Sequence, residues 1–439
     1  MCSASGTPRL VVVGGGAAGF MGAIEAARGA KELGSQLEVV VLEATSKCCS
    51  KVKISGGGRC NVMHDERKPL NIITNGYPRG QKQLLGPFTR FGPPETAAWF
   101  RKEGVTLKTE EDGRMFPTTD NSQTIIDALE GAASRAGVRI RTNVRVESVG
   151  KGPDGRFRVA TKERKKEGSG DGAVDCDYLL LAPGSSRLAY AWASQLGHVL
   201  EDPVPSLFTF NIEDAMLMGL AGLSVQEAEV SVPNPAKPKS PLKQKGPVLI
   251  THTGVSGPAI LRLSAFGARA LHESGYKTRL KINWAPELPR GVEGAMEQIL
   301  SAKSSEAAKL IGGSNGPTFG LPRRLWNAIV ERCGISADAK WGEVKNADLR
   351  KVAMNLCACE LEVSGKGTFK DEFVTAGGVA LKGIDMKLMQ SKSVPGLFFA
   401  GEIVDIDGIT GGYNFQSAWT TGWTAGRSAA ALSAQPRGT

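Results

Sequence analysis

The sequence predicts an α/β fold in which a parallel sheet is interrupted by a long insertion. Residues 9–43 read as a strand, a glycine turn, an Ala-rich helix and a second strand. Apolar runs that end in small residues return at 176–186 and 396–402, as expected of further strands in the same sheet. From about residue 203 onward, short alternating runs such as "LFTFNIE" and "TRLKINW" indicate a β-rich insertion.

The first strand–turn–helix unit carries a dinucleotide-binding signature, Gly-x-Gly-x-x-Gly, with an acidic residue 24 positions after its last glycine. The first glycine permits a tight turn, the second lets a pyrophosphate approach the backbone, and the third lets helix and strand pack closely. Free N–H groups at the helix start would bind the phosphates, and the acid would accept hydrogen bonds from a ribose. The expected cofactor-binding residues here are Gly14, Gly16, Ala17, Ala18, Gly19 and Glu43.

Two later stretches favour FAD over NAD. "YLLLAPGSS" would place another strand and a Pro-Gly turn beside the dinucleotide, and "GLFFAGE" ends in an acid that can reach the ribityl hydroxyls of a flavin. "TGGYNF" would open a C-terminal helix whose N–H groups stabilise the anionic reduced flavin. A second Gly-x-Gly-x-x-Gly domain is absent from the sequence. These stretches add the cofactor-binding candidates Ala182, Gly184, Gly401, Glu402, Gly411, Gly412, Tyr413 and Asn414.

Composition excludes several other classes of protein. The 439 residues are 41% hydrophobic and 22% charged, as in an ordinary globular protein, and contain no apolar run long enough for a membrane span. The eight cysteines form neither a disulfide framework nor a zinc-ligand pattern, so no metal site is expected. We therefore expect a reducing compartment, cytoplasmic or organellar if a transit peptide has been removed, and not secretion.

Three motifs resemble those of the BaiN-like flavoproteins, also called aminoacetone oxidase-like FAD-dependent oxidoreductases. They are "KVKISGGGRCN", "THTGVSGPAILRLS" and "TAGGV…VPGLFFAGEIVDIDGITGGYNFQSAWTTG", and the resemblance extends over essentially the whole chain. It implies a two-dinucleotide-binding-type, Rossmann-like FAD domain interrupted by a β-rich domain and a small helical domain. One branch of this family reduces C=C bonds of a steroidal enone with a reduced nicotinamide.

The expected domain boundaries follow from this pattern. The FAD-binding domain is assigned to 1–202 and 372–439, the β-rich inserted domain to 203–288 and 356–371, and the small helical domain to 289–355.

The resemblance also implies that the Gly-rich "SGGGRCN" loop brings backbone against the FAD. Its arginine is expected to pair with phosphate or to hold the loop, while the cysteine and asparagine face the flavin region. This chain departs from the family pattern just upstream, where it reads Cys49-Ser50 in place of a glycine and a basic residue and keeps Lys51, so the pair Cys48-Cys49 is particular to this chain. The cofactor-binding candidates of this region are Lys51, Ser55, Gly57, Gly58, Arg59, Cys60 and Asn61, and Val146 is added from the alternating segment 138–149.

Few protein groups are needed for flavin chemistry, because the cofactor carries the redox step. We expect an oxidoreductase that transfers hydride through flavin N5 to a small organic substrate, with NAD(P)H as a transient electron donor for reduction of a C=C or C=N bond. The catalytic candidates are Cys60, Asn61, Tyr413 and Asn414.

Two alternatives remain open. A net charge of +10 and the Lys-rich segment 238–245 would suit a flavin-dependent tRNA- or RNA-modifying enzyme, although nucleic-acid binding is not the expectation. The sequence shows no separate nicotinamide-binding domain, and this absence would suit a non-catalytic, FAD-bound redox sensor.

Overall fold

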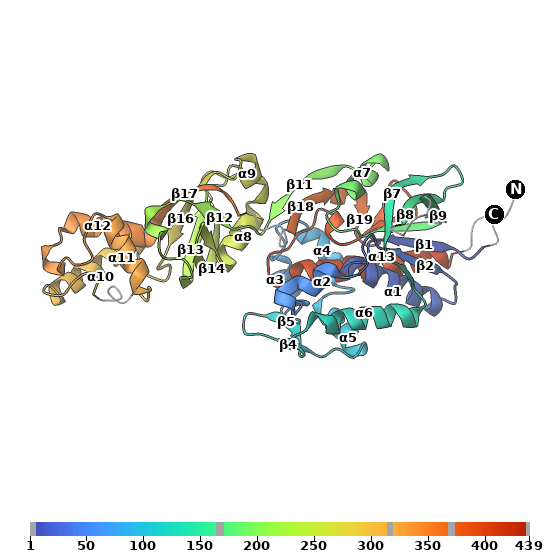
Figure 1. Ribbon diagram of the computed structural model, residues 1–439, viewed down its shortest axis with the longest axis horizontal. Coiled ribbons are helices and arrows are strands. Elements are labelled where there is room, and N and C mark those ends of the chain that lie inside the picture. Colours follow the sequence, from blue (N-terminus) through green and yellow to red (C-terminus); the bar gives the residue numbers. More distant parts are fainter. Residues whose placement is uncertain (1–5, 164–170, 314–318, 368–373, 436–439) are drawn as a thin grey trace. The chain divides into compact units, whose positions relative to one another are not determined.

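The computed structural model describes residues 6–163, 171–313, 319–367 and 374–435. The chain divides into two units, Met1–Pro203 with Thr375–Thr439 (unit 1) and Val204–Val374 (unit 2) (Figure 1). Unit 2 holds both the segment expected to be β-rich and the segment expected to be helical. The division into three domains stays a prediction, and 368–373 and 436–439 lie outside the described residues.

Unit 1 is built on a sheet whose central strands are parallel, which confirms the predicted fold class. All residues of the strand after Arg9 are buried, as is typical of a parallel strand that is covered on both faces. In spatial order the strands are β19 (Ile384–Asp385), β20 (Gln390–Ser391), β21 (Leu397–Phe399), β10 (Tyr178–Leu181), β1 (Arg9–Val13), β2 (Glu38–Leu42) and β6 (Arg139–Arg141).

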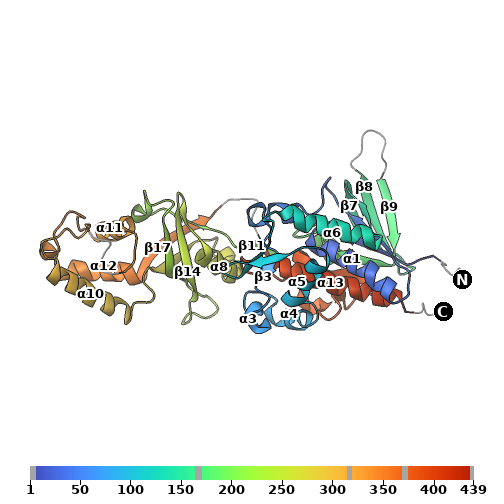
Figure 2. The ribbon, with the colours of Figure 1, turned by 90° about the horizontal axis from the view of Figure 1, so that it is seen from below.

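Two helices of unit 1, α1 (Ala17–Glu32) and α13 (Tyr413–Ser433), pack closely along each other (Figure 2). Glycines make this possible: a Cβ on Gly422 would lie 2.4 Å from the Ala18 carbonyl oxygen, and one on Gly426 would lie 2.3 Å from that of Gly22. Because both contacts advance by four residues, the helices run parallel. Their N-termini therefore point toward the same end of unit 1.

The segment 62–125 contains a small antiparallel sheet as well as helices. Its strands are β3 (Met63–His64), β5 (Arg114–Pro117) and β4 (Leu107–Thr109), and its helices are α3 (Leu70–Thr74), α4 (Gln81–Phe88) and α5 (Pro93–Lys102). The remaining elements before β10 are α2 (Ser50–Ile54), the 3-10 turn η1 (Ser55–Gly58), α6 (Ser122–Ala136), β7 (Val144–Lys151), β8 (Phe157–Glu163) and β9 (Asp171–Cys176). Helix α7 (Arg187–Gln195) follows β10.

Unit 2 contains a closed barrel with helices beside it (Figure 1). The barrel strands in spatial order are β12 (Phe210–Ile212), β15 (Gly254–Ser256), β14 (Leu242–Thr251), β13 (Ser224–Val232), β16 (Thr278–Asn283) and β17 (Cys359–Lys366). The helices are α8 (Pro258–Phe266), α9 (Ala268–Glu273), α10 (Gly291–Ser305), α11 (Arg323–Arg332) and α12 (Asn346–Ala358). Within the Lys-rich segment 238–245, the residues from Leu242 onward belong to β14 and pair with β13.

The chain passes between the units along a two-stranded ladder of β11 (Leu200–Ser206) and β18 (Val374–Val379). None of the helices that the structure describes has an apolar run long enough to span a bilayer. The cysteines among the described residues are free thiols.

Candidate functional site

The glycines of the turn after β1 have different roles. Gly14 adopts φ +105°, and a Cβ there would lie 2.4 Å from the carbonyl oxygen of Ala182. A Cβ on Gly19 would lie 1.9 Å from the Gly14 carbonyl oxygen, so helix and strand could not pack as they do. Gly16 has an ordinary extended conformation, and no atom lies within 4 Å of its Cβ position. Backbone packing requires the first and third glycines, whereas the second leaves an open surface at the start of α1.

Glu43 follows β2 and lies beside this turn. Its Oε2 accepts the N–H of Gly15 at 2.8 Å, and its Oε1 accepts the N–H of Thr45 at 2.8 Å. Val144, at the start of β7, donates its N–H to the Glu43 carbonyl at 2.9 Å, and the predicted Val146 is buried two residues further along. The carboxylate is half-buried at one edge of the glycine surface.

The segments that follow four adjacent parallel strands stand in a row. In spatial order they begin with Gly401 after β21, Ala182 after β10, Gly14 after β1 and Glu43 after β2. Neighbouring strands are about 4.8 Å apart, so the row is about 14 Å long. Ligands of open α/β sheets bind at the carboxyl ends of the strands, and this row is such an edge.

Three predicted residues meet at the β21 end of the row. Glu402 Oε2 lies 2.5 Å from the ammonium of Lys51, and a Cβ on Gly184 would lie 3.7 Å from the same oxygen. Glu402 Oε1 accepts the backbone N–H of Thr375 at 3.2 Å. The neighbouring Gly401 donates its N–H to the hydroxyl of Thr421 on α13 at 2.9 Å. An acid, a cation and a left-handed glycine therefore form one cluster.

The "SGGG" turn, η1, also presents bare backbone. Gly57 and Gly58 have φ +68° and +84°, and no atom lies within 4 Å of either Cβ position. Gly56 faces inward, since its Cβ would lie 3.0 Å from the backbone nitrogen of Asn61. The hydroxyl of Ser55 donates to the Val52 carbonyl at 2.8 Å and so holds the turn onto α2.

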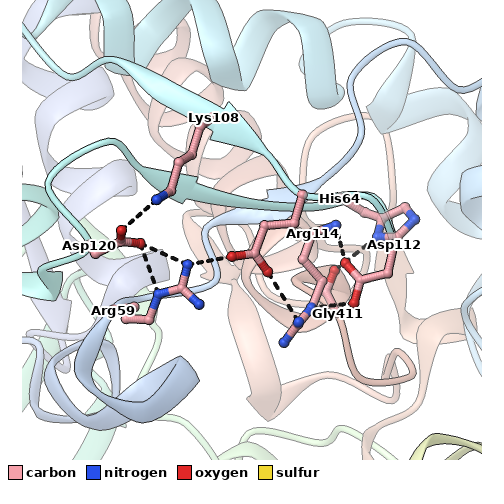
Figure 3. Close-up of polar contacts among 8 residues, drawn as sticks. Arg59, His64, Lys108, Asp112, Arg114, Asp120 and Gly411 are labelled. Atoms are coloured by element: carbon pink, nitrogen blue, oxygen red, sulfur yellow. Dashed lines mark hydrogen bonds and ion pairs between the residues drawn. The ribbon is translucent and has the colours of Figure 1, made fainter. Parts of the chain in front are cut away.

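Arg59 is bound to the protein and does not extend from the turn as a free phosphate ligand. Its guanidinium pairs with Glu110 and with Asp120 (Figure 3). It also lies 3.9 Å from the ring centroid of Phe116. Lys108 shares Asp120 and Arg114 shares Glu110, so the contacts form a chain of ion pairs across the β3–β5–β4 sheet. Of the two roles expected for Arg59, the contacts support holding the loop.

Cys60 and Asn61 connect this loop to the rest of unit 1. Cys60 is fully buried with φ +60°, and burial raises the pKa of its thiol to about 12. With its amide oxygen facing Gly412, Asn61 accepts the Gly412 N–H at 3.1 Å and donates to the Met63 carbonyl at 3.1 Å. The asparagine ties the loop to the start of α13.

Of the two glycines before α13, only Gly412 packs tightly against β3. A Cβ on Gly412 would lie 2.4 Å from the carbonyl carbon of Met63, whereas the nearest atom to a Cβ on Gly411 is 3.6 Å away. Tyr413 is buried, and its carbonyl accepts the hydroxyl of Tyr77 at 2.6 Å. Asn414 differs from the expectation that it faces the flavin, because both polar atoms of its side chain bind the backbone of Gly408.

His64 is a site residue that the sequence analysis missed. Its ring stacks on Tyr413 with 4.9 Å between centroids, and Nδ1 lies 3.2 Å from the carbonyl oxygen of Gly411 (Figure 3). Nε2 lies 2.9 Å from the ammonium of Lys68, and burial, with Lys68 next in effect, lowers the pKa of the ring. The neutral ring can donate from Nδ1 to Gly411 and accept at Nε2 from Lys68. An isolated histidine at the end of a two-residue strand has no sequence pattern that would predict these contacts.

These groups fit FAD. Open backbone at Gly16, Gly57 and Gly58 would accommodate phosphate oxygens and the cofactor backbone without collision. Glu43 and Glu402, at the two ends of the row, would accept hydrogen bonds from ribose and ribityl hydroxyls. Helix α13 begins at Tyr413 and passes the start of α1 at Gly422, nine residues later. The two helix N-termini are therefore about 13 Å apart along the helix axis. One helix N-terminus can therefore serve the pyrophosphate and the other the flavin ring.

This fold and this set of groups define an FAD-dependent oxidoreductase. The chain belongs to the family described as "HI0933-like protein Rossmann domain", whose profile matches residues 8–428. The match agrees with the family resemblance inferred from the three motifs.

Individual relatives agree with this class. The 3-dehydro-bile acid delta(4,6)-reductase of Clostridium scindens is 27% identical over 432 residues, which are 96% of this chain and 99% of that protein. The ribosomal RNA dihydrouridine synthase of Escherichia coli is 26% identical over 422 residues, covering 94% and 96% of the two chains. The structure of the 3-ketosteroid-delta4-(5alpha)-dehydrogenase of Rhodococcus jostii covers 98% of each chain with a TM-score of 0.50 and 15% identity, which supports the fold.

Proposed function

We propose that the protein is an FAD-dependent reductase of a C=C bond conjugated to a carbonyl group, acting on a small organic substrate. The observation that carries the cofactor assignment is the row of Glu43, Gly14, Ala182 and Gly401 at the carboxyl ends of four adjacent parallel strands, with an acid beside each end. Similarity over nearly the full length to a bile acid delta(4,6)-reductase supports the choice of bond.

Bound FAD would supply hydride transfer between an electron donor and the substrate. The residues of this chain hold and orient it. Glu43 and Glu402 fix the two ends, the open glycines admit its backbone, and the α13 N-terminus offers positive dipole to the flavin ring. The sequence contains no second Gly-x-Gly-x-x-Gly motif, so we propose that NAD(P)H donates electrons at the flavin and leaves, with no nicotinamide domain of its own.

Reduction of a pyrimidine in RNA is the second candidate. Dihydrouridine is uridine whose C5=C6 bond has been saturated, and that bond is also conjugated to a carbonyl group. The same reaction class would therefore serve both substrates. The net charge of +10 and the name of the Escherichia coli relative favour this candidate.

One experiment tests both candidates. The FAD-loaded protein is reduced anaerobically with NADH or NADPH, and reoxidation is followed at 450 nm after mixing with a steroidal 4-en-3-one or with ribosomal RNA that lacks dihydrouridine. We expect reoxidation by the enone and a product two hydrogens heavier by mass spectrometry. Reoxidation by RNA alone, with dihydrouridine formed, would replace the first candidate by the second. Reoxidation by neither would contradict the proposed reductase activity.

Salt dependence separates specific RNA recognition from charge alone. Each phosphate contact on a single strand should contribute a slope of about 0.7 log unit per log unit of salt. Binding that disappears by moderate salt without any dihydrouridine product would mean that the basic surface attracts RNA without modifying it.

A further inference from the structure

Two side chains hold the peptide group between Gly411 and Gly412, directly before α13. His64 Nδ1 lies 3.2 Å from the carbonyl oxygen of Gly411 (Figure 3). The amide oxygen of Asn61 accepts the N–H of Gly412 at 3.1 Å. Both polar groups of this peptide are therefore bound by the segment that leads into β3 and forms it.

This peptide depends on such contacts because it lies between two glycines, which adopt φ +108° and +90°. Glycine populates positive and negative φ about equally, so a peptide between two glycines rotates at little cost unless its polar groups are bound. Gly411 also has room to move, since no atom lies closer than 3.6 Å to its Cβ position. Rotation would reverse the dipole of the peptide and shift the backbone that leads into α13.

The contacts of His64 determine which ring nitrogen carries the proton. An ammonium group has only donors, so Nε2, which lies 2.9 Å from Lys68 Nζ, must accept. The proton of the neutral ring is therefore on Nδ1, facing the Gly411 carbonyl. The ring is buried and stacks on Tyr413 with 4.9 Å between centroids, which restricts its rotation. His64 thus presents a fixed N–H donor to Gly411.

We propose that His64 is a positioning residue for the flavin ring of bound FAD. By holding the Gly411 carbonyl, it fixes the direction of the first N–H groups of α13, which would stabilise the negative charge of the reduced flavin. This inference rests on the proposed cofactor and adds to it a residue that tunes the flavin potential. His64 acts through α13 and has no part in the transfer of hydride.

Two variants of similar size separate the hydrogen bond from the bulk of the ring. His64→Leu has no donor, whereas His64→Asn can place an amide N–H where Nδ1 lies. At pH 8 we expect reduced FAD to lose about 2- to 5-fold more affinity than oxidised FAD in His64→Leu, as for a weakened helix terminus. This change equals a fall of about 10–20 mV in the two-electron midpoint potential. His64→Asn should retain the wild-type potential.

His198→Leu is the matched control for the loss of a buried histidine. His198 is 5% exposed, and its Nε2 lies 2.9 Å from the hydroxyl of Ser391 on β20. This variant should lower the melting temperature of the protein and leave the flavin potential unchanged. A wild-type potential in His64→Leu would overturn the inference. Equal falls in His64→Leu and in either His64→Asn or His198→Leu would also overturn it, because the hydrogen bond to Gly411 would then not be the cause.

If His64→Leu does not fold, the ring nitrogens of the wild-type protein decide. The chain contains four histidines, so labelling with ¹⁵N-histidine gives few NMR signals, and those of His64 are identified by their loss in His64→Asn. A proton on Nδ1 alone, together with a wild-type potential in His64→Asn, would support the inference. Any other result would overturn it. A wild-type protein that binds no FAD would instead contradict the proposed function.

Discussion

The side chain of Asn414 binds both backbone polar groups of Gly408. Its Oδ1 accepts the Gly408 N–H at 2.8 Å, and its Nδ2 donates to the Gly408 carbonyl at 2.9 Å. Gly408 is buried, so water cannot easily replace either bond. The contact fixes the segment that leads into the start of α13.

Asn414→Leu should therefore destabilise the protein. Each unsatisfied buried backbone group costs about 1–3 kcal/mol, and this variant leaves two. Chemical unfolding of the apoprotein measures the loss. Asn414→Asp retains an acceptor for the Gly408 N–H and should lose less. Full apoprotein stability with a shifted flavin potential in Asn414→Leu would show instead that the side chain acts on the cofactor.

Gly16→Val should abolish FAD binding while leaving the fold intact. The backbone of Gly16 is extended and its Cβ position is open, so the apoprotein can accept the side chain, whereas a bound pyrophosphate could not. Absorbance at 450 nm per protein gives the FAD content, and calorimetry gives the melting temperature. Gly19→Ala serves as the contrasting variant, because its Cβ meets backbone 1.9 Å away and should lower the melting temperature itself. A full FAD load in Gly16→Val would place the cofactor elsewhere.

Gly412→Ala should destabilise the protein more than Gly411→Ala. Both residues have positive φ, so both variants share backbone strain of about 1–3 kcal/mol. Only a Cβ on Gly412 would collide with the backbone of Met63, which adds an overpacking penalty of about 1–3 kcal/mol. The difference in free energy of unfolding between the variants measures that penalty. Equal losses would mean that β3 can move away from α13.

The thiols near the glycine surface should be unreactive. Burial raises the pKa of Cys48 to about 12, and of Cys60 to about 12, and the pKa of Cys49 is also raised by burial. At pH 8 the thiolate fraction of such a group is on the order of 10⁻⁴, and the thiolate is the reactive form. Alkylation with iodoacetamide, mapped by mass spectrometry, should be slow at all three. Cys48→Ser/Cys49→Ser should leave the rate of flavin reduction unchanged, and a lost rate would show that the pair carries electrons.

Stability should fall as the pH is lowered below neutrality because of two histidines. Burial lowers the pKa of His64 and of His198 from the ordinary value of 6.5. Lys68 adds to the shift of His64, while Asp65 and Asp112 oppose it. The unfolded chain therefore binds protons at a higher pH than the folded protein does. Between pH 6.5 and the folded pKa values, the free energy of unfolding should decrease with decreasing pH.

Urea unfolding between pH 7.5 and 4.5 tests this dependence. His64→Gln and His198→Gln should each remove part of the slope. An undiminished slope in the double variant would assign the effect to other groups.

Much of the candidate FAD site could be predicted from local sequence patterns. The first glycine turn, Glu43 and Glu402 each follow a strand whose apolar run is visible in the sequence, and strand ends in a parallel sheet share one edge. The sequence left two roles open for Arg59, phosphate binding and holding the loop. Its partners Glu110 and Asp120 follow strands β4 and β5 of a small sheet that the sequence did not indicate. Asn414 was assigned to the flavin because helix starts favour ligands, but its partner is determined by a turn six residues upstream.

By itself, the sequence determined the elements whose physical basis is local: the buried strands, the glycines that must lack a Cβ, the acids at strand ends and the helices that follow them. The tertiary structure decided which side chains remain available to a ligand. His64 reaches Gly411 only because β3 packs against the start of α13. Tyr190 is buried on α7, and its hydroxyl has no hydrogen-bond partner among the described residues. Hydrogen bonds and burial depend on groups distant in the chain, and a linear pattern does not encode which of them meet.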